Sequence, residues 1–194
     1  MCILIKKLEN DEEQIINLQK FLFGQIKKEF GYGYVPAFHR DIKNLNDYYI
    51  EPERNIFLIA IDEDSNEIVA TIGLRAYDKN FKEFNGIYSN ESTASIWRLF
   101  VDEKYRRCGI ASKLFKLIET FAFENQFGEI YLHTHKTLDG ALDFWKEMGF
   151  KITIDSNNEL QTVHMEKNIS QDIFGSSLYK YHIQKNSEEY KILI

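Results

Sequence analysis

The sequence predicts an α/β (α+β) fold in which helices pack against a central mixed β-sheet. Segments with apolar residues at helical spacing alternate with short β-prone runs along the chain. The β-prone runs at 55–61 and 67–76 are joined by a short polar turn, which is typical of a hairpin. The later strands at 95–101 and 129–134 are each followed by a helix, and such connections require at least one parallel strand pair.

The first half of the chain is predicted to begin with a strand over 2–6 and a long helix. The helix has Asn10 or Asp11 as N-cap and Gly31 as its stop. Its apolar residues at helical spacing are Ile15, Leu18, Leu22 and Ile26. A glycine- and proline-containing loop then leads to a second, shorter helix over 37–45. After the hairpin comes a long polar connection over 78–93, and loops of that length are often functional.

In the second half, Gly109 is predicted to open a helix that Gly128 ends, and Gly149 to stop a shorter one. The last predicted strands cover 150–154 and 161–166. We expect one domain over 1–168 and a C-terminal extension of unknown role over 169–194. The apolar residues of this extension, including Ile173, Phe174, Leu178 and Tyr179, predict either a cap on the sheet or contact with a second subunit in a homodimer.

Composition restricts the class of protein. The chain has 194 residues, which suits one domain, and its formal charge is 24 − 30 = −6. An acidic chain gains nothing from phosphate neutralisation, so nucleic acid is not an expected partner. Cys2 and Cys108 are too few for a disulfide scaffold and have no metal-ligand spacing. Because no signal peptide and no membrane-spanning apolar run is present, we expect a cytoplasmic protein without a membrane partner.

The strongest local signal is a strand, a tight basic turn and a glycine that opens a helix. The turn is Arg106-Arg107-Cys108-Gly109-Ile110-Ala111. A helix N-terminus offers unpaired N–H groups and partial positive charge, and phosphates bind there readily. Gly109 permits close backbone approach, and the two arginines add mobile positive charge. The spacing matches neither the dinucleotide fingerprint nor the nucleotide P-loop. The turn is therefore either another kind of anion site or a solvated basic turn.

Arg106-x-x-Gly109-x-Ala111 resembles the [RQ]-x-x-G-x-[GA] acetyl-CoA motif of the GNAT (Gcn5-related N-acetyltransferase) superfamily. The flanks agree with this resemblance. Residues 99–105 are similar to the V-x-P-x-Y approach to that motif, with Lys104 where proline is common, and 141–150 resemble the A-x-x-F-Y-x-x-x-G-F block. Residues 67–74 are similar to the third strand of the family. The match covers roughly residues 3–167 in the family's order.

The resemblance implies a sheet that splays open between the strands at 95–101 and 129–134, with acetyl-CoA as acyl-donor cosubstrate in the opening. Its pyrophosphate would lie on the N–H groups of 106–111. The residues implied to bind it are Leu99, Phe100, Val101, Arg106, Arg107, Cys108, Gly109, Ile110, Ala111, Ser112, Asp139 and Trp145. Cys108 is interpreted as a spacer, since no histidine is nearby in sequence to activate it.

Acetyl transfer needs a base or a water chain that takes a proton from the amine, and a donor to the developing oxyanion. The resemblance gives the oxyanion role to the amide of Val101. It places Trp145 where a tyrosine often protonates the leaving thiolate, and an indole is no useful acid. Tyr131, His133 and His135 are the other candidates, each with the alternative of packing in the sheet or facing solvent. The strand at 95–99 carries no carboxylate to act as base.

The acceptor wall is expected from residues 29–41 and the loop at 78–94. Tyr32, Tyr34 and Phe38 offer aromatic surface there. Arg98 is unusual on an apolar strand, because an unpaired buried cation is costly. It either binds an acidic group of the substrate or pairs with a carboxylate such as Asp41.

The sequence thus predicts an acetyl-CoA-dependent N-acetyltransferase acting on the primary amine of a small molecule or protein, without a metal. The alternative is a weakly active or inactive acetyl-CoA sensor or interaction module of the same fold. Trp145 and the missing strand carboxylate motivate this alternative.

Overall fold

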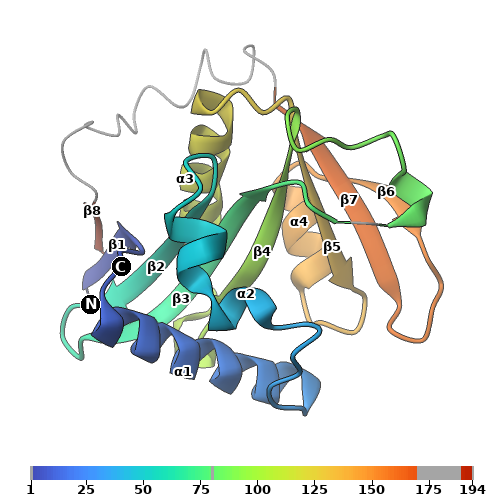
Figure 1. Ribbon diagram of the computed structural model, residues 1–194. Helices are drawn as coiled ribbons and strands as arrows, with labels where there is room; N and C mark the ends of the chain where they lie inside the picture. Colours follow the sequence, from blue (N-terminus) through green and yellow to red (C-terminus); the bar gives the residue numbers. More distant parts are fainter. Residues whose placement is uncertain (1, 80, 170–188, 194) are drawn as a thin grey trace. The chain divides into compact units, whose positions relative to one another are not determined.

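The computed structural model describes residues 2–79, 81–169 and 189–193 (Figure 1). The chain divides into two compact units. Unit 1 comprises 1–75, 97–118 and 181–194, and unit 2 comprises 76–96 and 119–180. Strand β4 (Thr93–Val101) and helix α3 (Ile110–Glu124) contribute residues to both. The strand order is β6-β7-β5-β4-β3-β2-β1-β8, and the parallel β4–β5 pair makes the sheet mixed, as predicted.

Unit 1 begins with β1 (Cys2–Lys7) and the long helix α1 (Glu12–Phe30). The Asp11 side chain caps α1 by accepting a 2.7 Å hydrogen bond from the Gln14 amide. Gly31 ends α1 with a φ of 74°, and its N–H donates to the Lys27 carbonyl at 3.0 Å. Both predicted helix limits are confirmed.

The core of unit 1 is formed where α1 packs on strand β2 (Ile56–Asp62). Figure 1 shows α1 and α2 (Arg40–Lys43) on the same side of the unit 1 strands. The buried residues of this core are Leu8, Leu18, Leu22, Ile26, Ile42, Leu45, Tyr49, Phe57 and Ile59. Strand β3 (Glu67–Ala76) completes the predicted hairpin with β2, paired from Ile56↔Leu74 to Asp62↔Glu67 with a register shift between Ala60 and Ile61.

The helix predicted over 37–45 is wrong in its extent. Hydrogen bonds from the Phe38 and His39 amides to the Val35 carbonyl hold a turn up to residue 39, so α2 covers only Arg40–Lys43. A π-helical turn follows at Asn46–Ile50, where the Glu51 amide bonds to the Asn46 carbonyl. Tertiary packing overrides the regular helical period here.

Unit 2 contains β5 (Glu129–His135), α4 (Ala141–Glu147), β6 (Lys151–Asp155) and β7 (Thr162–Asn168). β4 and β5 pair in parallel over three residue pairs, from Thr93↔Glu129 to Ser95↔Tyr131, whereas β5 and β7 pair antiparallel along their full length. A cluster of buried aromatic residues fills the unit: Tyr77, Phe84, Tyr88 and Tyr131. A short 3₁₀ turn, Lys82–Phe84, lies within the long connection predicted over 78–93.

The predicted extension contributes strand β8 (Glu189–Leu193), which pairs antiparallel with β1 from Cys2↔Leu193 to Lys6↔Glu189. This part of the extension continues the sheet beyond β1. The apolar residues at 173–179 that suggested a cap or a second subunit lie outside the described residues.

Candidate functional site

Strand β4 has an irregular backbone at Arg98, whose φ of 52° lies in the left-handed region. That conformation costs a non-glycine residue roughly 1 kcal/mol or more and interrupts regular strand pairing. Three contacts hold it. The Thr71 hydroxyl donates to the Arg98 carbonyl at 2.8 Å, and the guanidinium bonds to Asp41 and to the Phe38 carbonyl. The strand therefore changes course immediately before residues 99–101, which the resemblance assigns to the cofactor.

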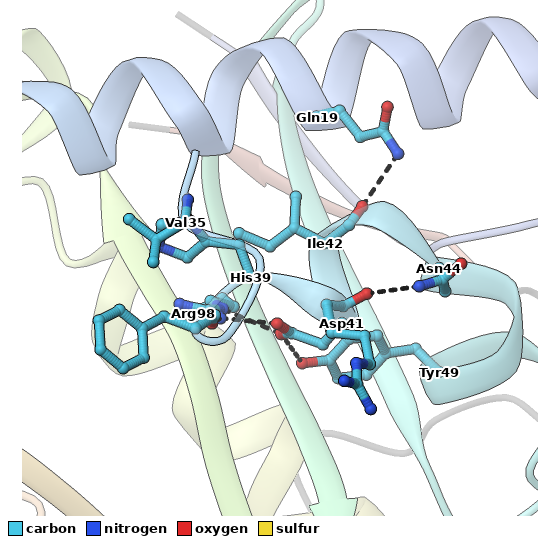
Figure 2. Close-up of polar contacts among 10 residues, drawn as sticks. Gln19, Val35, His39, Asp41, Ile42, Asn44, Tyr49 and Arg98 are labelled. Carbon is cyan, nitrogen blue, oxygen red and sulfur yellow. Dashed lines mark hydrogen bonds and ion pairs between the residues drawn. The ribbon is translucent and has the colours of Figure 1, made fainter. Parts of the chain in front are cut away.

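Figure 2 shows the Arg98 guanidinium directed at the Asp41 carboxylate. Nη2 lies 2.6 Å from Oδ1 and Nε lies 2.9 Å from Oδ2, which is bidentate geometry. The Tyr49 hydroxyl donates to Oδ2 at 2.9 Å. Of the two alternatives for Arg98, the structure contains the pair with Asp41.

Burial raises the pKa of Asp41, but the hydrogen bonds and positive charge of Arg98 outweigh it and hold that pKa below its ordinary value. The neighbouring His39 ring accepts a 2.9 Å hydrogen bond from the Val35 amide. Burial, followed by the charge of Arg98, lowers the pKa of His39. The site behind the 31–39 loop thus holds a paired carboxylate and a neutral imidazole at neutral pH.

The predicted anion turn lies entirely in unit 1. Arg107 and Gly109 both have positive φ, 65° and 76°, and the first regular helical bond of α3 joins the Lys113 amide to the Gly109 carbonyl at 3.1 Å. Helix geometry leaves the amides of Ile110, Ala111 and Ser112 without intrahelical partners. A Cβ on Gly109 would meet nothing within 4 Å. The glycine is therefore explained by its backbone angle and leaves open space beside the turn.

Side chains from distant elements fix the approach to this turn. The Tyr105 hydroxyl donates to the Asp62 carboxylate at 2.6 Å, which ties the turn to the end of β2. Asp102 accepts from the Lys104 amide at 3.1 Å and from Lys28 of α1 at 3.3 Å. These contacts fix the position of the N-terminus of α3 within unit 1.

Arg106 does not supply the mobile charge predicted for it. Its guanidinium forms an ion pair with Glu29 of α1, and its Nε donates to the Val101 carbonyl at 3.2 Å. Arg106 is thereby a brace between α1 and the end of β4. Arg107 is exposed and remains the cation available at the turn. The Cys108 thiol lies 3.6 Å from the Arg106 carbonyl.

The aromatic residues predicted for the acceptor wall gather around His39. Tyr32, Tyr34 and Phe38 are 42%, 47% and 64% exposed, and the ring of each lies within 6.5 Å of the His39 ring. Phe23 of α1 packs edge-on against His39 at 5.8 Å. Three partly exposed rings on one short loop offer an aromatic surface of the kind that binding sites use.

Five candidate residues named from the sequence belong to unit 2: Tyr131, His133, His135, Asp139 and Trp145. Tyr131 is fully buried, and its hydroxyl lies 2.6 Å from Nδ1 of His164. Burial, with the neighbouring Tyr77 and Tyr88 hydroxyls, raises the pKa of Tyr131 far above its ordinary value. His133 lies 3.4 Å from Lys79 Nζ. His135 contacts the Thr162 hydroxyl at 3.3 Å, and burial lowers its pKa.

Trp145 is 6% exposed and packs between Phe144 and Phe150, at 4.9 and 5.2 Å between ring centroids. Asp139 precedes α4 and is exposed, because Gly140 with a φ of 69° delays the helix to Ala141. The structure therefore brings together the unit 1 candidates of β4 and the anion turn. Tyr131, His133, His135, Asp139 and Trp145 belong to unit 2.

The sequence alone does not reveal the contacts of Glu29 and His164 with the candidates Arg106 and Tyr131. It also does not reveal Asp62, which holds Tyr105 beside the turn. Glu29 is 77 residues from Arg106, and no local pattern signals such a contact. Across 2–79, 81–169 and 189–193, no cluster of three metal-ligating side chains occurs. In the same stretches no helix combines the length and apolar character that crossing a membrane requires.

The order of elements, the interrupted β4 and the turn that opens α3 define a fold of the GNAT class. The acetyltransferase (GNAT) family model matches residues 20–150, and the chain belongs to this family.

Among its relatives, N-acetylaspartate synthetase of Rattus norvegicus is 23% identical over 78% of this chain and 46% of its own length. Human N-acetyltransferase 8 is 26% identical over 58% of this chain and 46% of its own length. The chain thus spans about half the length of these relatives.

Solved structures share the fold. A GNAT acetyltransferase from Staphylococcus aureus superposes with a TM-score of 0.68 at 23% identity, over 86% of this chain and 99% of that chain. An aminoglycoside 6'-N-acetyltransferase complexed with coenzyme A gives 0.60 at 16%, over 86% and 97%. The NatC complex bound to Gag peptide and CoA gives 0.64 at 22%, over 88% and 100%.

Proposed function

We propose that this chain is an acetyl-CoA-dependent N-acetyltransferase that acylates the primary amine of a small molecule or a protein. The observation that carries the proposal is the preformed anion turn. The backbone amides of Ile110, Ala111 and Ser112 lie at the start of α3, directly after Gly109. Gly109 has a positive φ, and the space beside it is open. Arg107 is exposed and adds positive charge. Donors of this kind fit a pyrophosphate.

Acetyl-CoA, when bound, supplies an acetyl group activated as a thioester. The residues of this chain that would hold it are the backbone of Leu99–Val101 and the turn and first helical residues at 106–112. In unit 2, Asp139 and Trp145 are the proposed further contacts. The Val101 amide is the proposed donor to the oxyanion that develops on the carbonyl, where such donors contribute strongly.

The acceptor amine is proposed to bind beside the aromatic rings of Tyr32, Tyr34 and Phe38. Aromatic faces bind ammonium groups, and the Lys43 ammonium already lies 5.3 Å from the Tyr34 ring centroid. Arg98 is engaged by Asp41 and by the Phe38 carbonyl. Its proposed contribution is therefore to hold this loop on β4 rather than to bind a substrate carboxylate directly.

The test is thiol release from acetyl-CoA in the presence of aspartate, an aminoglycoside and peptide N-termini, which are suggested by the names of the relatives and fold neighbours. Acetyl-CoA binding is measured in parallel by calorimetry. Thiol release that requires both acetyl-CoA and one amine class supports the proposal. Absence of acetyl-CoA binding at millimolar concentration would overturn it.

A second candidate function is an acetyl-CoA sensor, which the tryptophan at position 145 favours. Trp145 stands where the family resemblance places a tyrosine that releases a proton, and its ring is buried against Phe144 and Phe150. Binding of acetyl-CoA without transfer to any amine would support the sensor. The homodimer and the cytoplasmic location stay predictions from the sequence.

A further inference from the structure

The acceptor loop, residues 31–39 of unit 1, is arranged around one buried histidine. His39 is 2% exposed, whereas Tyr32, Tyr34 and Phe38, whose rings surround it, are exposed. The Tyr32 ring is stacked on His39 with an interplanar angle of 19°, and the Phe38 ring packs edge-on at 73°. The three rings proposed to contact the acceptor amine therefore pack around a single buried titratable group.

The His39 side chain also closes the backbone of this loop (Figure 2). The Val35 amide donates to Nδ1 of His39 at 2.9 Å, and the Val35 carbonyl accepts from the amides of Phe38 and His39 at 3.0 Å each. Val35 thus uses both its N–H and its carbonyl within five residues. Nδ1 accepts a hydrogen bond only when it carries no proton, so this arrangement belongs to the neutral ring with its proton on Nε2.

Arg98 adds a permanent positive charge beside the same ring. Its Nη2 donates to the carbonyl of Phe38, the residue directly before His39, at 2.6 Å. The charged or titratable groups around His39 are Arg98 on β4, Asp41 and Lys43 on α2, and Tyr32 and Tyr34 on the loop, and α1 contacts the ring through Phe23. Burial and then Arg98 lower the pKa of His39, whereas Asp41 raises it.

Protonation of His39 is incompatible with the closed loop. With a proton on Nδ1, two N–H groups would face each other at Val35, and a second cation would lie beside Arg98. The surrounding aromatic rings attract a cation, but they do so wherever the imidazole lies among them. The repulsion at Val35 is removed only when the ring and the Val35 amide move apart, so the protonated loop must change its conformation.

We propose that His39 is a positioning residue of the acceptor loop and makes acceptor binding depend on pH, because the loop is closed while the imidazole is neutral and is released when the ring takes up a proton. This inference rests on the proposed acetyltransferase function and assigns to it a regulation of the acceptor side. The residues proposed to hold acetyl-CoA do not include His39, so acetyl-CoA affinity should not follow the His39 titration.

The first test follows His39 in the full chain by long-range proton–nitrogen NMR between about pH 8 and about pH 4.5, and it needs no activity. At the upper limit the ring should carry its proton on Nε2 and none on Nδ1. As the ring is protonated, the Val35 amide should lose the downfield shift of a hydrogen-bonded N–H, and the Tyr32 and Phe38 ring signals should move with the same midpoint.

His135, a half-buried histidine of unit 2, is the internal control in these spectra, since its titration should leave the Val35 amide unchanged. Three results would overturn the proposal. They are a proton on Nδ1 of His39 at the upper limit, a ring that stays neutral at the lower limit, and a Val35 amide that does not follow the ring.

Two substitutions separate the hydrogen bond from the titration. The Oδ1 of an asparagine lies as far along the side chain as Nδ1 of histidine and accepts hydrogen bonds at every pH, so His39→Asn should keep the loop closed. His39→Leu fills space without an acceptor and should weaken acceptor binding at every pH. Calorimetry with acetyl-CoA should give equal affinities for both variants and the natural sequence.

The second test measures KM and kcat over the same pH range for whichever of aspartate, an aminoglycoside or a peptide N-terminus is acetylated. At about one pH unit below the His39 midpoint, about one ring in ten is neutral, so the acceptor KM should be about tenfold higher than that of His39→Asn. Protonation of the amine itself cancels in this comparison, because both proteins meet the same amine. The kcat values should stay similar.

The outcomes distinguish this inference from the function on which it rests. A KM ratio that does not change with pH, in a protein that acetylates the amine, would overturn the role of His39 alone. A Val35 amide that follows the His39 titration, without acetylation of any amine, would support the loop device and count against the proposed function.

Discussion

Arg98 and Asp41 meet through two N–H···O contacts of 2.6 and 2.9 Å, although they are 57 residues apart in the sequence. Asp41 is 4% exposed and the Arg98 side chain 14%. The pair is therefore largely removed from water, and loss of one member leaves the other charge without compensation.

Asp41→Ala is expected to lower the free energy of unfolding by about 3 kcal/mol, because it leaves the Arg98 guanidinium buried without its carboxylate. Urea denaturation measures the change. Asp47→Ala, an exposed carboxylate nearby, is the control and should change stability little. A loss at Asp41 no larger than at Asp47 would contradict the role given to the pair.

Asp41 is also expected to make the stability of the protein depend on pH within a defined acidic range. The folded pKa of Asp41 lies below its unfolded value of 3.8. Its contribution to stability is therefore complete above about pH 4 and is lost as pH falls through the folded pKa. Denaturation midpoints of the natural sequence and Asp41→Asn should converge at low pH. Parallel curves down to about pH 2 would exclude this linkage.

Two buried histidines, His39 and His164, and the half-buried His135 are expected to make stability pH-dependent in a second, higher range. Burial lowers the pKa of His39, His135 and His164 below the unfolded value of 6.5. The unfolded chain thus binds more protons at these positions, and stability should fall as pH decreases below about 6.5. Thermal unfolding in matched buffers measures this slope. His164→Gln should reduce it, and an unchanged slope would show that His164 contributes nothing.

Gly109→Glu should abolish acetyl-CoA binding, because it adds bulk and negative charge where the turn is open. Gly109→Ala is the matched control, since it carries the same strain at a φ of 76° without charge. It should cost about 1 kcal/mol of stability and retain most of the affinity. Calorimetry with acetyl-CoA checks both variants. Equal affinity of Gly109→Glu and the natural sequence would refute the anion turn.

Trp145→Phe should weaken acetyl-CoA or acceptor binding while leaving both limbs of the pH–rate profile in place. The reason is that the indole packs against Phe144 and Phe150 but has no acidic proton to give. Steady-state kinetics over pH measure the effect. Disappearance of one titrating limb would mean that Trp145 affects proton transfer.

The parts of the fold that were predictable are those with local causes. The Asp11 cap, the Gly31 stop and the period of α1 lie within one segment, and the sequence alone predicts them. The hairpin of β2 and β3 is equally local. The turn at Gly109 that opens α3 was predictable because its residues are contiguous.

The remaining features depend on contacts between distant residues. Position 98 adopts a left-handed backbone although arginine is not one of the residue types, glycine, asparagine and aspartate, that favour it. Contacts with Thr71 and Asp41 hold this conformation. Tyr131 and His164 lie 33 residues apart, and only the pairing of β5 with β7 brings them together. Residue type alone therefore identified Tyr131 as a candidate but not its partner.

Strand β8 pairs Leu193 with Cys2 at the edge of β1. Adjacent strands lie about 4.8 Å apart, so the first and last described residues are neighbours in space. A short glycine–serine linker can therefore join residues 2 and 193 in a permuted variant of residues 2–193, with new ends at the exposed turn 63–66 between β2 and β3. A reporter domain inserted at 63–66 would likewise leave the turn at Gly109 uninterrupted.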